Sequence, residues 1–456
     1  MSKNTLNLSC DSSCTFSPRR GNLFVCFILA TIYSISSLGQ INRVNVPQSP
    51  TPAPMDINYT GPLGNQNAFP NSNNGTSVYE QDLKRQKQKQ EETRQLLNEI
   101  DNDYSRAVSY ELPSCASKQG AEYFRQAFSK LQQIIQSDSL NIKQSVFAVE
   151  NAFFENKMKE DDFDKYLKQC LDICKWKLKK GKFKENDQLA KILVLYQFFA
   201  DTIRYVDSKT NQWKIHYPFK YDFDDYEGRK DYSKMFVSKL MATRSGQCHS
   251  LPLLFLILAE QWNVDAYLSY SPNHSFVRFK DKNGKIRNIE LTNGRLTTDS
   301  WVAGSGYVKA EALKSRIYLD TLSKKKVIAQ CFNDLAQEYA AKYCYDAFVL
   351  QCSNEAIKYF PNDIFAQEVK SDYYSLLFAY VVKQIGRPPV SDLPKYPQAY
   401  NIFLQRNQQY DLIDNLGFEP MPSEAYQKWL QSVQDEKNKE ESQHLILNIK
   451  QSLQKN

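Results

Sequence analysis

The spacing of apolar residues changes along the chain, and each spacing predicts a different kind of segment. From about 117 to 205, apolar residues recur at steps of three and four, which is typical of amphipathic helices. Gly181 and residues 137–139 interrupt this pattern and predict the ends of helices. Beyond 310 the helical spacing returns. Both regions are therefore expected to be mainly helical.

Residues 233–310 have a different pattern. A nearly unbroken apolar segment follows Cys248 and predicts a buried helix. Short segments with strand-forming composition come next, and the last two of them flank Asp281–Gly284, a hairpin-turn sequence. The strands are expected at 264–270, 275–280 and 285–291. The expected fold class is therefore α+β, with one core helix and an antiparallel sheet between helical regions.

Residues 1–39 are typical of an export signal. Basic residues precede an apolar run that starts at Leu23, and small residues lead to an expected cut after Gly39. An uncleaved anchor formed by residues 23–38 is the alternative, although a membrane span needs about 20 apolar residues. We expect an exported protein, periplasmic or extracellular, that meets a membrane only through this segment.

Composition divides the rest of the chain into further regions. The expected order is a signal peptide (1–39), a disordered Pro/Asn-rich linker (40–80), a helical region (81–232), the core (233–310) and a second helical region with a polar tail (311–456).

Smaller segments within these regions have their own expectations. Residues 81–104 are good helix formers with few apolar positions and predict a solvated helical spacer. Residues 206–232 lose the helical spacing and are expected to form a connecting loop. Residues 331–366 resemble one tetratricopeptide repeat, which predicts a helical pair that can bind a protein partner. The tail, 423–456, is expected to be helical and exposed.

Composition also bears on the partners and cofactors that can be expected. The 456-residue chain has 58 Lys and Arg against 51 Asp and Glu, a net charge of +7 without a dominant basic block. This balance argues against a nucleic-acid partner. No pair of Cys-x-x-Cys units and no His-x-x-x-His occurs, so neither a metal nor another cofactor is expected. The only histidines are at 216, 249, 274 and 444.

The cysteines outside the signal are odd in number. They lie at 115, 170, 174, 248, 331, 344 and 352. In an exported protein this number allows three disulfides and one free thiol. Cys170 and Cys174 are one helical turn apart, where they can form a pair or remain two ordinary buried thiols.

Cys248 stands at a position that favours a nucleophile. It follows Gly246 at the start of the buried helix, where unpaired N–H groups and the positive end of the helix dipole stabilise a thiolate. His274 opens the second strand and can act as a base toward the thiol. Glu290 lies near the end of the third strand and can orient the imidazole. A buried structural thiol is the simpler alternative for Cys248.

The strand register decides whether Glu290 can reach His274. With a two-residue turn at Lys282–Asn283, His274 lies opposite Leu291, and Glu290 faces the other side of the sheet. The triad therefore needs a bulge or a different register, and Gly284 offers a place for it.

The order of these features resembles that of the transglutaminase-like superfamily. The resemblance rests on Gly246-x-Cys248-x-Ser250, the helix and strands that follow, His274, and Ile289-Glu290-Leu291-Thr292. It implies a small papain-like core in which Cys248 is the nucleophile, His274 the base and Glu290 the orienting acid.

The sequence departs from that family in the surroundings of the triad. Glu290 replaces the usual Asp, Ser275 stands where Ala is common, and Asn288 stands where an aromatic residue often precedes the acid. Asn293 is a substitute orienting residue, because Asn has that role in other cysteine hydrolases.

Other residues are expected around the site. The oxyanion hole would use the backbone N–H of Cys248 and one upstream side chain, for which the candidates are Gln212, Trp213 and Tyr232. His249 is not the expected base, because consecutive helical residues point in different directions. His216 is expected to border the cleft, and His444 to be solvated in the tail.

The pattern supports two functions from different classes. The favoured one is an exported cysteine hydrolase or acyltransferase that acts on amide bonds of a protein or peptide. Its thioester intermediate would be resolved by water or by an amine. The alternative is a non-enzymatic scaffold that binds a peptide or protein on its helical repeats and carries a degenerate triad. The complete set of Cys248, His274 and Glu290 favours the enzyme.

Overall fold

The computed structural model describes residues 84–85, 87–95, 108–226, 228, 230–304, 307–422, 424–432 and 435. The expected signal peptide, the alternative anchor and the linker (1–80) lie outside these residues, as does His444. The described residues of the expected spacer, within 84–95, are helical and exposed, as predicted. The chain combines helices with small sheets, mostly antiparallel, which agrees with the expected α+β class.

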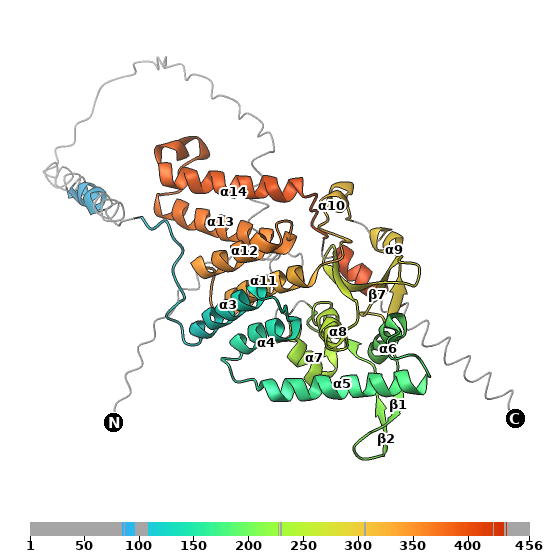
Figure 1. Cartoon of the computed structure of the whole chain (residues 1–456). Coiled ribbons are helices and arrows are strands. Elements are labelled where there is room, and N and C mark those ends of the chain that lie inside the picture. The colour runs from blue at the N-terminus through green and yellow to red at the C-terminus, as the bar shows by residue number, and fades with distance from the viewer. Residues whose placement is uncertain are drawn as a thin grey trace, which may run out of the picture.

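One part of the molecule is a stack of antiparallel helices (Figure 1). In spatial order they are α4 (Ile142–Phe153), α3 (Ala121–Gln136), α11 (Lys324–Lys342), α12 (Ala347–Tyr359), α13 (Ile364–Gln384) and α14 (Pro397–Asn415). The stack therefore joins segments from both helical regions of the sequence. Side-chain caps fix several helix starts. For example, Asp363 accepts hydrogen bonds from the backbone N–H groups of Phe365 and Ala366 at the start of α13.

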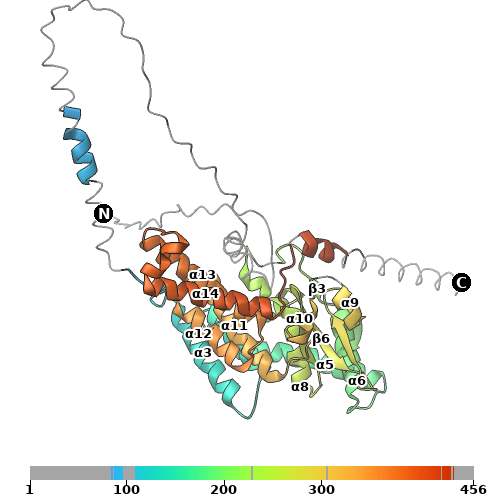
Figure 2. The ribbon, with the colours of Figure 1, turned by 90° about the horizontal axis from the view of Figure 1, so that it is seen from above.

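The other part surrounds α8 (Ser250–Gln261) and lies beside the stack (Figure 2). It also contains α5 (Glu160–Lys180), α6 (Gln188–Ala200), the 3-10 helix η3 (Tyr232–Met235), α7 (Val237–Thr243), α9 (Asp299–Gly304) and α10 (Ala310–Lys314). The side chains of α8 from Ser250 to Ala259 are all buried, as its unbroken apolar sequence predicted. The same hydrophobic core continues into the helical stack, so α8 occupies the centre of the molecule.

A four-stranded antiparallel sheet lies next to α8. Its strands, in spatial order, are β5 (Tyr267–Ser271), β6 (His274–Lys280), β7 (Ile286–Glu290) and β8 (Arg295–Thr297). The sequence predicted the first three strands within a few residues but not the short β8. The pairs Val277↔Ile289 and Lys280↔Ile286 show that the β6–β7 register is one residue away from the one expected for a two-residue turn. Gly284 lies in this turn with φ 74°, a conformation that favours glycine.

The expected loop over 206–232 is wrong in part, because it contains strands. β1 (Ile203–Val206) pairs with β2 (Trp213–His216) in an antiparallel hairpin. β3 (Lys220–Tyr221) pairs in parallel with β4 (Ser245–Gly246), just before Cys248. These strands are too short for the alternation test, and their burial comes from contacts with distant helices.

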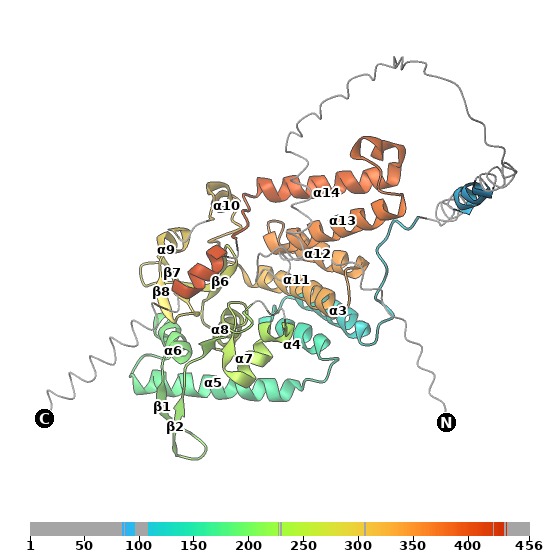
Figure 3. The same cartoon turned by 180° about the vertical axis from the view of Figure 1, so that it is seen from behind.

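The expectation of an exposed tail is also wrong where the structure describes it. Residues 424–432 are helical and lie against the sheet, beside β6 and β7 (Figure 3). Tyr426 and Leu430 are buried there. Apolar side chains one turn apart hold this short helix on the core, although its composition is polar.

One disulfide links the beginning of the described region to the helical stack. Cys115 pairs with Cys344, between α11 and α12. The remaining cysteines of the described residues, among them Cys170 and Cys174, are buried free thiols. The three disulfides that the cysteine number allows are therefore not formed in this part of the chain. Within the described residues, no helix combines the length and apolar character that a membrane crossing requires.

Candidate functional site

Cys248 lies in the turn that leads from β4 into α8, two residues before the helix begins. The turn is tight because the Gln247 N–H donates to Ser250 Oγ at 2.9 Å. Gly246 is required here, since a Cβ at this position would lie 2.7 Å from Ser250 Oγ and 2.8 Å from a Leu240 methyl group. The Cys248 side chain is thus buried in the turn that leads into α8.

His274 enters the site from the β5–β6 hairpin. Its backbone pairs with Ser271, and the turn between them contains Asn273 in the left-handed conformation, with φ 57°. The hydroxyl of Ser275 donates to the backbone carbonyl of Cys248. This bond joins the strand that carries the imidazole to the turn that carries the thiol. Ser275, a departure from the family pattern, therefore has a structural role here.

Glu290 is the partner of His274. The observed register places Glu290 and His274 on the same face of the sheet as diagonal neighbours. His274 Nε2 and Glu290 Oε2 are 2.6 Å apart, and Glu290 Oε1 accepts a hydrogen bond from the Thr292 N–H at 2.9 Å. Because Nε2 is bound to the carboxylate, Nδ1 is the ring nitrogen left for the thiol.

The charges of this group are coupled. Burial alone lowers the pKa of His274, but the Glu290 charge and a side-chain contact with Cys248 raise that pKa to about 10. Burial alone raises the pKa of Glu290, but the His274 charge and the hydrogen bonds from His274 and Thr292 lower it overall. These interactions favour an imidazolium paired with a carboxylate, while Nδ1 has no hydrogen-bond partner within the described residues.

Tyr221 is a neighbour of the triad that sequence reasoning missed. The β3–β4 pairing sets Tyr221 opposite Gly246, next to the cysteine turn. Burial raises the pKa of Tyr221 well above its usual value, and the nearby Cys248 and Glu290 charges raise it further. Its hydroxyl is buried and has no hydrogen-bond partner within the described residues. Two strand residues in a loop-like segment give no sequence signal for this placement.

Trp429 is the second neighbour that the sequence did not indicate. Its ring lies 4.7 Å from the His274 ring, centroid to centroid, at an interplanar angle of 58°. The exposed fractions of Cys248, His274 and Glu290 are only 1%, 3% and 2%. The helix over 424–432 thus covers the triad from the far end of the chain.

The structure does not bring the expected oxyanion residues to the triad. Gln212 is exposed in the β1–β2 hairpin, and Trp213 is 64% exposed beside Trp176. Tyr232 stacks on Phe153 and its hydroxyl donates to Gln337. These predictions are wrong because proximity in sequence to the cysteine helix does not determine which strand edge faces the sulfur.

The two asparagines near Glu290 have separate surroundings. Asn288 accepts a hydrogen bond from Arg278 Nε at 3.1 Å and donates to Asp299 at 2.9 Å. It therefore supports the ion pair between the buried Arg278 and the exposed Asp299. Asn293 is buried, yet neither amide atom has a hydrogen-bond partner within the described residues. Glu290, and not Asn293, contacts the imidazole.

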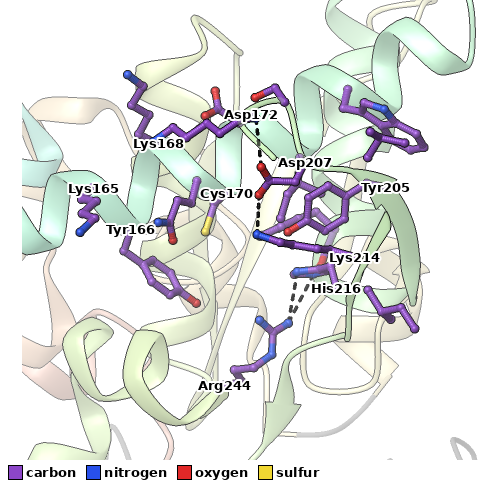
Figure 4. Close-up of a pocket in the computed structure, with 18 residues that line it drawn as sticks. Lys165, Tyr166, Lys168, Cys170, Asp172, Tyr205, Asp207, Lys214, His216 and Arg244 are labelled. Carbon is purple, nitrogen blue, oxygen red and sulfur yellow. Dashed lines mark hydrogen bonds and ion pairs between the residues drawn. The ribbon is translucent and has the colours of Figure 1, made fainter. Parts of the chain in front are cut away.

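The other described histidines lie away from the sulfur. His249 points to Asp334 of α11, with 3.6 Å between His249 Nε2 and Asp334 Oδ2. His216 borders a different hollow, a cavity of about 320 Å³ between α5 and the β1–β2 hairpin. Figure 4 shows His216 beside Arg244 in this cavity, with Lys214 and Asp207 paired nearby. The sequence-based expectation that His216 borders the triad cleft is therefore wrong.

No group of three or more His, Cys, Asp or Glu side chains that could hold a metal occurs in the described part of the chain. Comparison with family models, with curated proteins and with solved structures finds no match. The function must therefore be argued from the site itself.

Proposed function

We propose that this protein is a cysteine hydrolase or acyltransferase of transglutaminase-like type that acts on amide bonds of a protein or peptide. The observation that carries the proposal is the buried Glu290–His274 pair, whose other ring nitrogen, Nδ1, has no hydrogen-bond partner within the described residues and remains for the thiol of the buried Cys248. This arrangement supplies a nucleophile, a base and an orienting acid.

The chemistry follows from these positions. The Cys248 thiolate attacks the amide carbonyl, forming a C–S bond and a tetrahedral intermediate. His274 Nδ1–H gives its proton to the leaving nitrogen, the C–N bond breaks and a thioester remains. His274 then takes a proton from water, or from an acceptor amine, as it attacks the thioester. A C–O or C–N bond forms, the C–S bond breaks and the sulfur leaves as the thiolate. The product is a carboxylic acid or a new amide, and the Cys248 thiolate and the His274 imidazolium are regenerated.

The oxyanion that forms in both steps needs hydrogen-bond donors. The backbone N–H of Cys248, at the start of α8, is one donor in this proposal. The hydroxyl of Tyr221 is the second, because it is buried without a hydrogen-bond partner among the described residues and Tyr221 pairs with Gly246, two residues before Cys248. Tyr221 replaces Gln212, Trp213 and Tyr232 as the side-chain candidate.

The test is an activity assay on the full chain. Labelled casein reports hydrolysis, and casein with a fluorescent primary amine reports transfer. Cys248→Ala and His274→Gln are expected to lower either signal to background, while Cys331→Ala, which removes another buried thiol, retains it. Because Trp429 covers His274, the Trp429→Ala chain is assayed in parallel.

The opposite result supports the alternative function. The cysteine-hydrolase proposal is wrong if neither wild type nor Trp429→Ala hydrolyses casein or attaches the fluorescent amine to it. It is also wrong if Cys248→Ala stays active. The binding-scaffold alternative then remains, with the helical stack as its protein-binding surface and the near-complete burial of the triad as its support.

We further propose that the chain is exported. The Cys115–Cys344 disulfide supports this, because such bonds persist mainly in oxidising compartments. Amino-terminal sequencing of the mature protein is expected to begin near Gln40. A protein that is recovered from the cytoplasm and still begins at Met1 would contradict export.

A further inference from the structure

We infer that residues 418–422 and 424–432, named here the strap, occupy the groove in which an extended peptide substrate binds, so that the full chain holds its own triad closed. This inference rests on the proposed function and specifies the substrate class and its regulation. It is carried by the contacts that the strap makes with His274, with the residue before it and with the segment that follows β3.

The first contact is on the imidazole side. Trp429 packs on His274 at 4.7 Å between ring centroids. The triad residues are almost completely buried, and a peptide carbonyl can reach the sulfur only if the side chains that cover it move. Trp429 belongs to a short helix of the terminal segment, so its removal leaves the strands and α8 in place.

The second set of contacts continues along the strap. Tyr426 is fully buried, stacks on Trp429 at 5.6 Å between ring centroids and lies 5.9 Å from the Tyr226 ring. The strap therefore packs on the segment that follows β3 as well as on the imidazole.

The start of the strap resembles a bound peptide. Residues 418–422 form neither helix nor strand, and the side chain of Met421 is buried. The Met421 carbonyl accepts a hydrogen bond from the Asn273 side chain at 3.4 Å, one residue before His274. A backbone carbonyl of an extended segment is therefore held beside the base. We expect a substrate to bind here as an extended chain, with an apolar side chain in the place of Met421.

A fixed point at the end of α14 defines where the strap begins. Gly417 has φ 82°, and a Cβ there would lie 2.4 Å from the backbone nitrogen of Ala312. Ser315 Oγ donates to the Leu416 carbonyl at 2.6 Å. The chain is thus held at 416–417, while the contacts that close the site lie beyond it. Release of the strap can occur without unfolding α14.

Because the strap is part of the same chain as the site, it competes strongly with a free substrate. A segment tethered close to its groove competes with a free substrate at an effective concentration that reaches the millimolar range for short connections. A substrate must therefore displace the strap, or a partner must draw it away. A peptide with the sequence of residues 418–432, added separately, is expected to bind the open groove.

Access to Cys248 provides a test that does not depend on catalysis. The full chain is treated with iodoacetamide, and labelled cysteines are mapped by mass spectrometry over time. Trp429→Ala and Tyr426→Ala are expected to accelerate labelling of Cys248 at least tenfold, with Cys170 and Cys331 still slow. Trp213→Ala, which removes an exposed tryptophan elsewhere, is the matched control and is expected to leave all rates unchanged.

The outcomes separate the strap from the proposed activity. Unchanged labelling of Cys248 in both variants, or equal acceleration at every buried thiol, overturns the inference. Restored protection by the added peptide supports occupancy of the groove, and no protection overturns it. If Cys248 is labelled faster in the variants but no hydrolysis or transfer is seen, the inference that the strap closes the site holds and the proposed function is rejected. If wild type and Trp429→Ala have equal catalytic rates, the inference about the strap is rejected and the proposed function is retained.

Discussion

At the residue scale, the Glu290–His274 pair makes the stability of the folded chain depend on pH. The pKa of His274 is raised in the folded chain to about 10, so its contribution to stability is complete below about 6.5 and is lost as pH rises through about 10. The pKa of Glu290 is lowered from 4.5, so its contribution is present above about 4.5 and is lost as pH falls through the folded value. Between about pH 4.5 and pH 6.5 both contributions are complete, and the pair stabilises the strands that carry it.

Glu290→Gln tests the orienting role. We expect the fold to persist, because the amide fills the same space, but activity to fall by about 10³–10⁴. Without the carboxylate, the imidazolium loses its partner and the correct tautomer is no longer enforced. The measurement is kcat/KM on the peptide substrate, together with a circular dichroism spectrum that verifies the fold.

Asn293→Ala is the matched comparison for Glu290→Gln. Asn293 is buried close by but does not contact the imidazole, so its replacement is expected to change kcat/KM less than about threefold. If Asn293→Ala abolishes activity while Glu290→Gln retains it, the roles are reversed and the orienting assignment is wrong.

His216 provides a prediction at a second buried imidazole. Burial lowers its pKa to about 4; the hydrogen bond with the Phe198 carbonyl opposes this, and the Arg244 charge lowers it further. Nε2 lies 2.6 Å from that carbonyl, so it carries the proton, and Nδ1 accepts from Arg244. We expect NMR spectra to show a neutral Nε2–H ring from pH 5 to 8.

Arg244 explains part of that neutral state. Arg244→Gln is expected to raise the pKa of His216, because it removes the adjacent positive charge while burial remains. Arg204→Gln, an exposed substitution on β1, is expected to leave it unchanged. A wild-type His216 that titrates near 6.5 contradicts the buried arrangement.

At the element scale, the β6–β7 hairpin shows what the sequence could predict. Alternation located both strands, and the position of His274 indicated that a one-residue change of register was needed to bring Glu290 to it. The structure contains that change, and Lys280 pairs with Ile286. A period-two pattern identifies the faces of a strand, but the turn geometry at Gly284 decides which residues are opposite each other.

Other parts of the site could not be predicted because they depend on distant packing. Tyr221 belongs to a two-residue strand whose pairing partner, Gly246, lies beyond α7. Trp429 reaches His274 from the opposite end of the chain. Apolar residues at 425, 426, 429 and 430 have helical spacing, but this spacing does not show which distant element the helix packs against. Local patterns indicated Cys248, His274 and Glu290, whereas the residues that surround them come from tertiary contacts.

Glu150 caps α7 from another helix, and its removal should weaken that element. Glu150 Oε1 accepts from the Val237 N–H at 2.6 Å, and Oε2 accepts from the Ser238 N–H at 2.9 Å. Glu150→Ala leaves two buried donors without a partner, and we expect a loss of about 1–3 kcal/mol in the free energy of unfolding. Urea unfolding measures it, with the exposed Glu122→Ala as a control expected to change stability by less than about 0.5 kcal/mol.

The pH dependence of the same cap gives an independent check. Burial raises the pKa of Glu150 to about 7, the Ser238 and Val237 bonds oppose this, and the nearby Asp334 charge adds to it. The folded state therefore holds a proton that the unfolded chain loses above about 4.5, so this group's contribution to stability falls between pH 4.5 and 7. Glu150→Gln has no such loss. Its destabilisation relative to wild type should be smaller at pH 8 than at pH 5, and the reverse order would contradict the assignment.

At the scale of the whole molecule, α8 joins the triad to the helical stack. Its side chains belong to the same hydrophobic core as those of α3 and α11, so the cysteine turn is supported from both sides. The strap closes this unit at its carboxyl-terminal end, and the Cys115–Cys344 disulfide ties down the segment before α3. Both connections link positions far apart in the chain. The site is therefore a product of the complete described fold and not of residues 233–310 alone.

The disulfide should contribute measurably to this closed arrangement. Cys115 and Cys344 are separated by 229 residues, and a cross-link over so long a loop strongly restricts the unfolded chain. Nearby, the Cys115 N–H donates to Asp346, which also accepts from the Tyr339 hydroxyl, so the native segment is held in place by hydrogen bonds as well. Cys115→Ala is therefore expected to fold but to lose about 2–5 kcal/mol in the free energy of unfolding. Dithiothreitol should lower the stability of wild type by a similar amount and have little further effect on Cys115→Ala, whereas Cys352→Ala should remain as sensitive to the reductant as wild type. A wild-type chain whose urea midpoint does not move on reduction would show that the bond adds nothing to the folded state, and the support it gives to an exported protein would be lost.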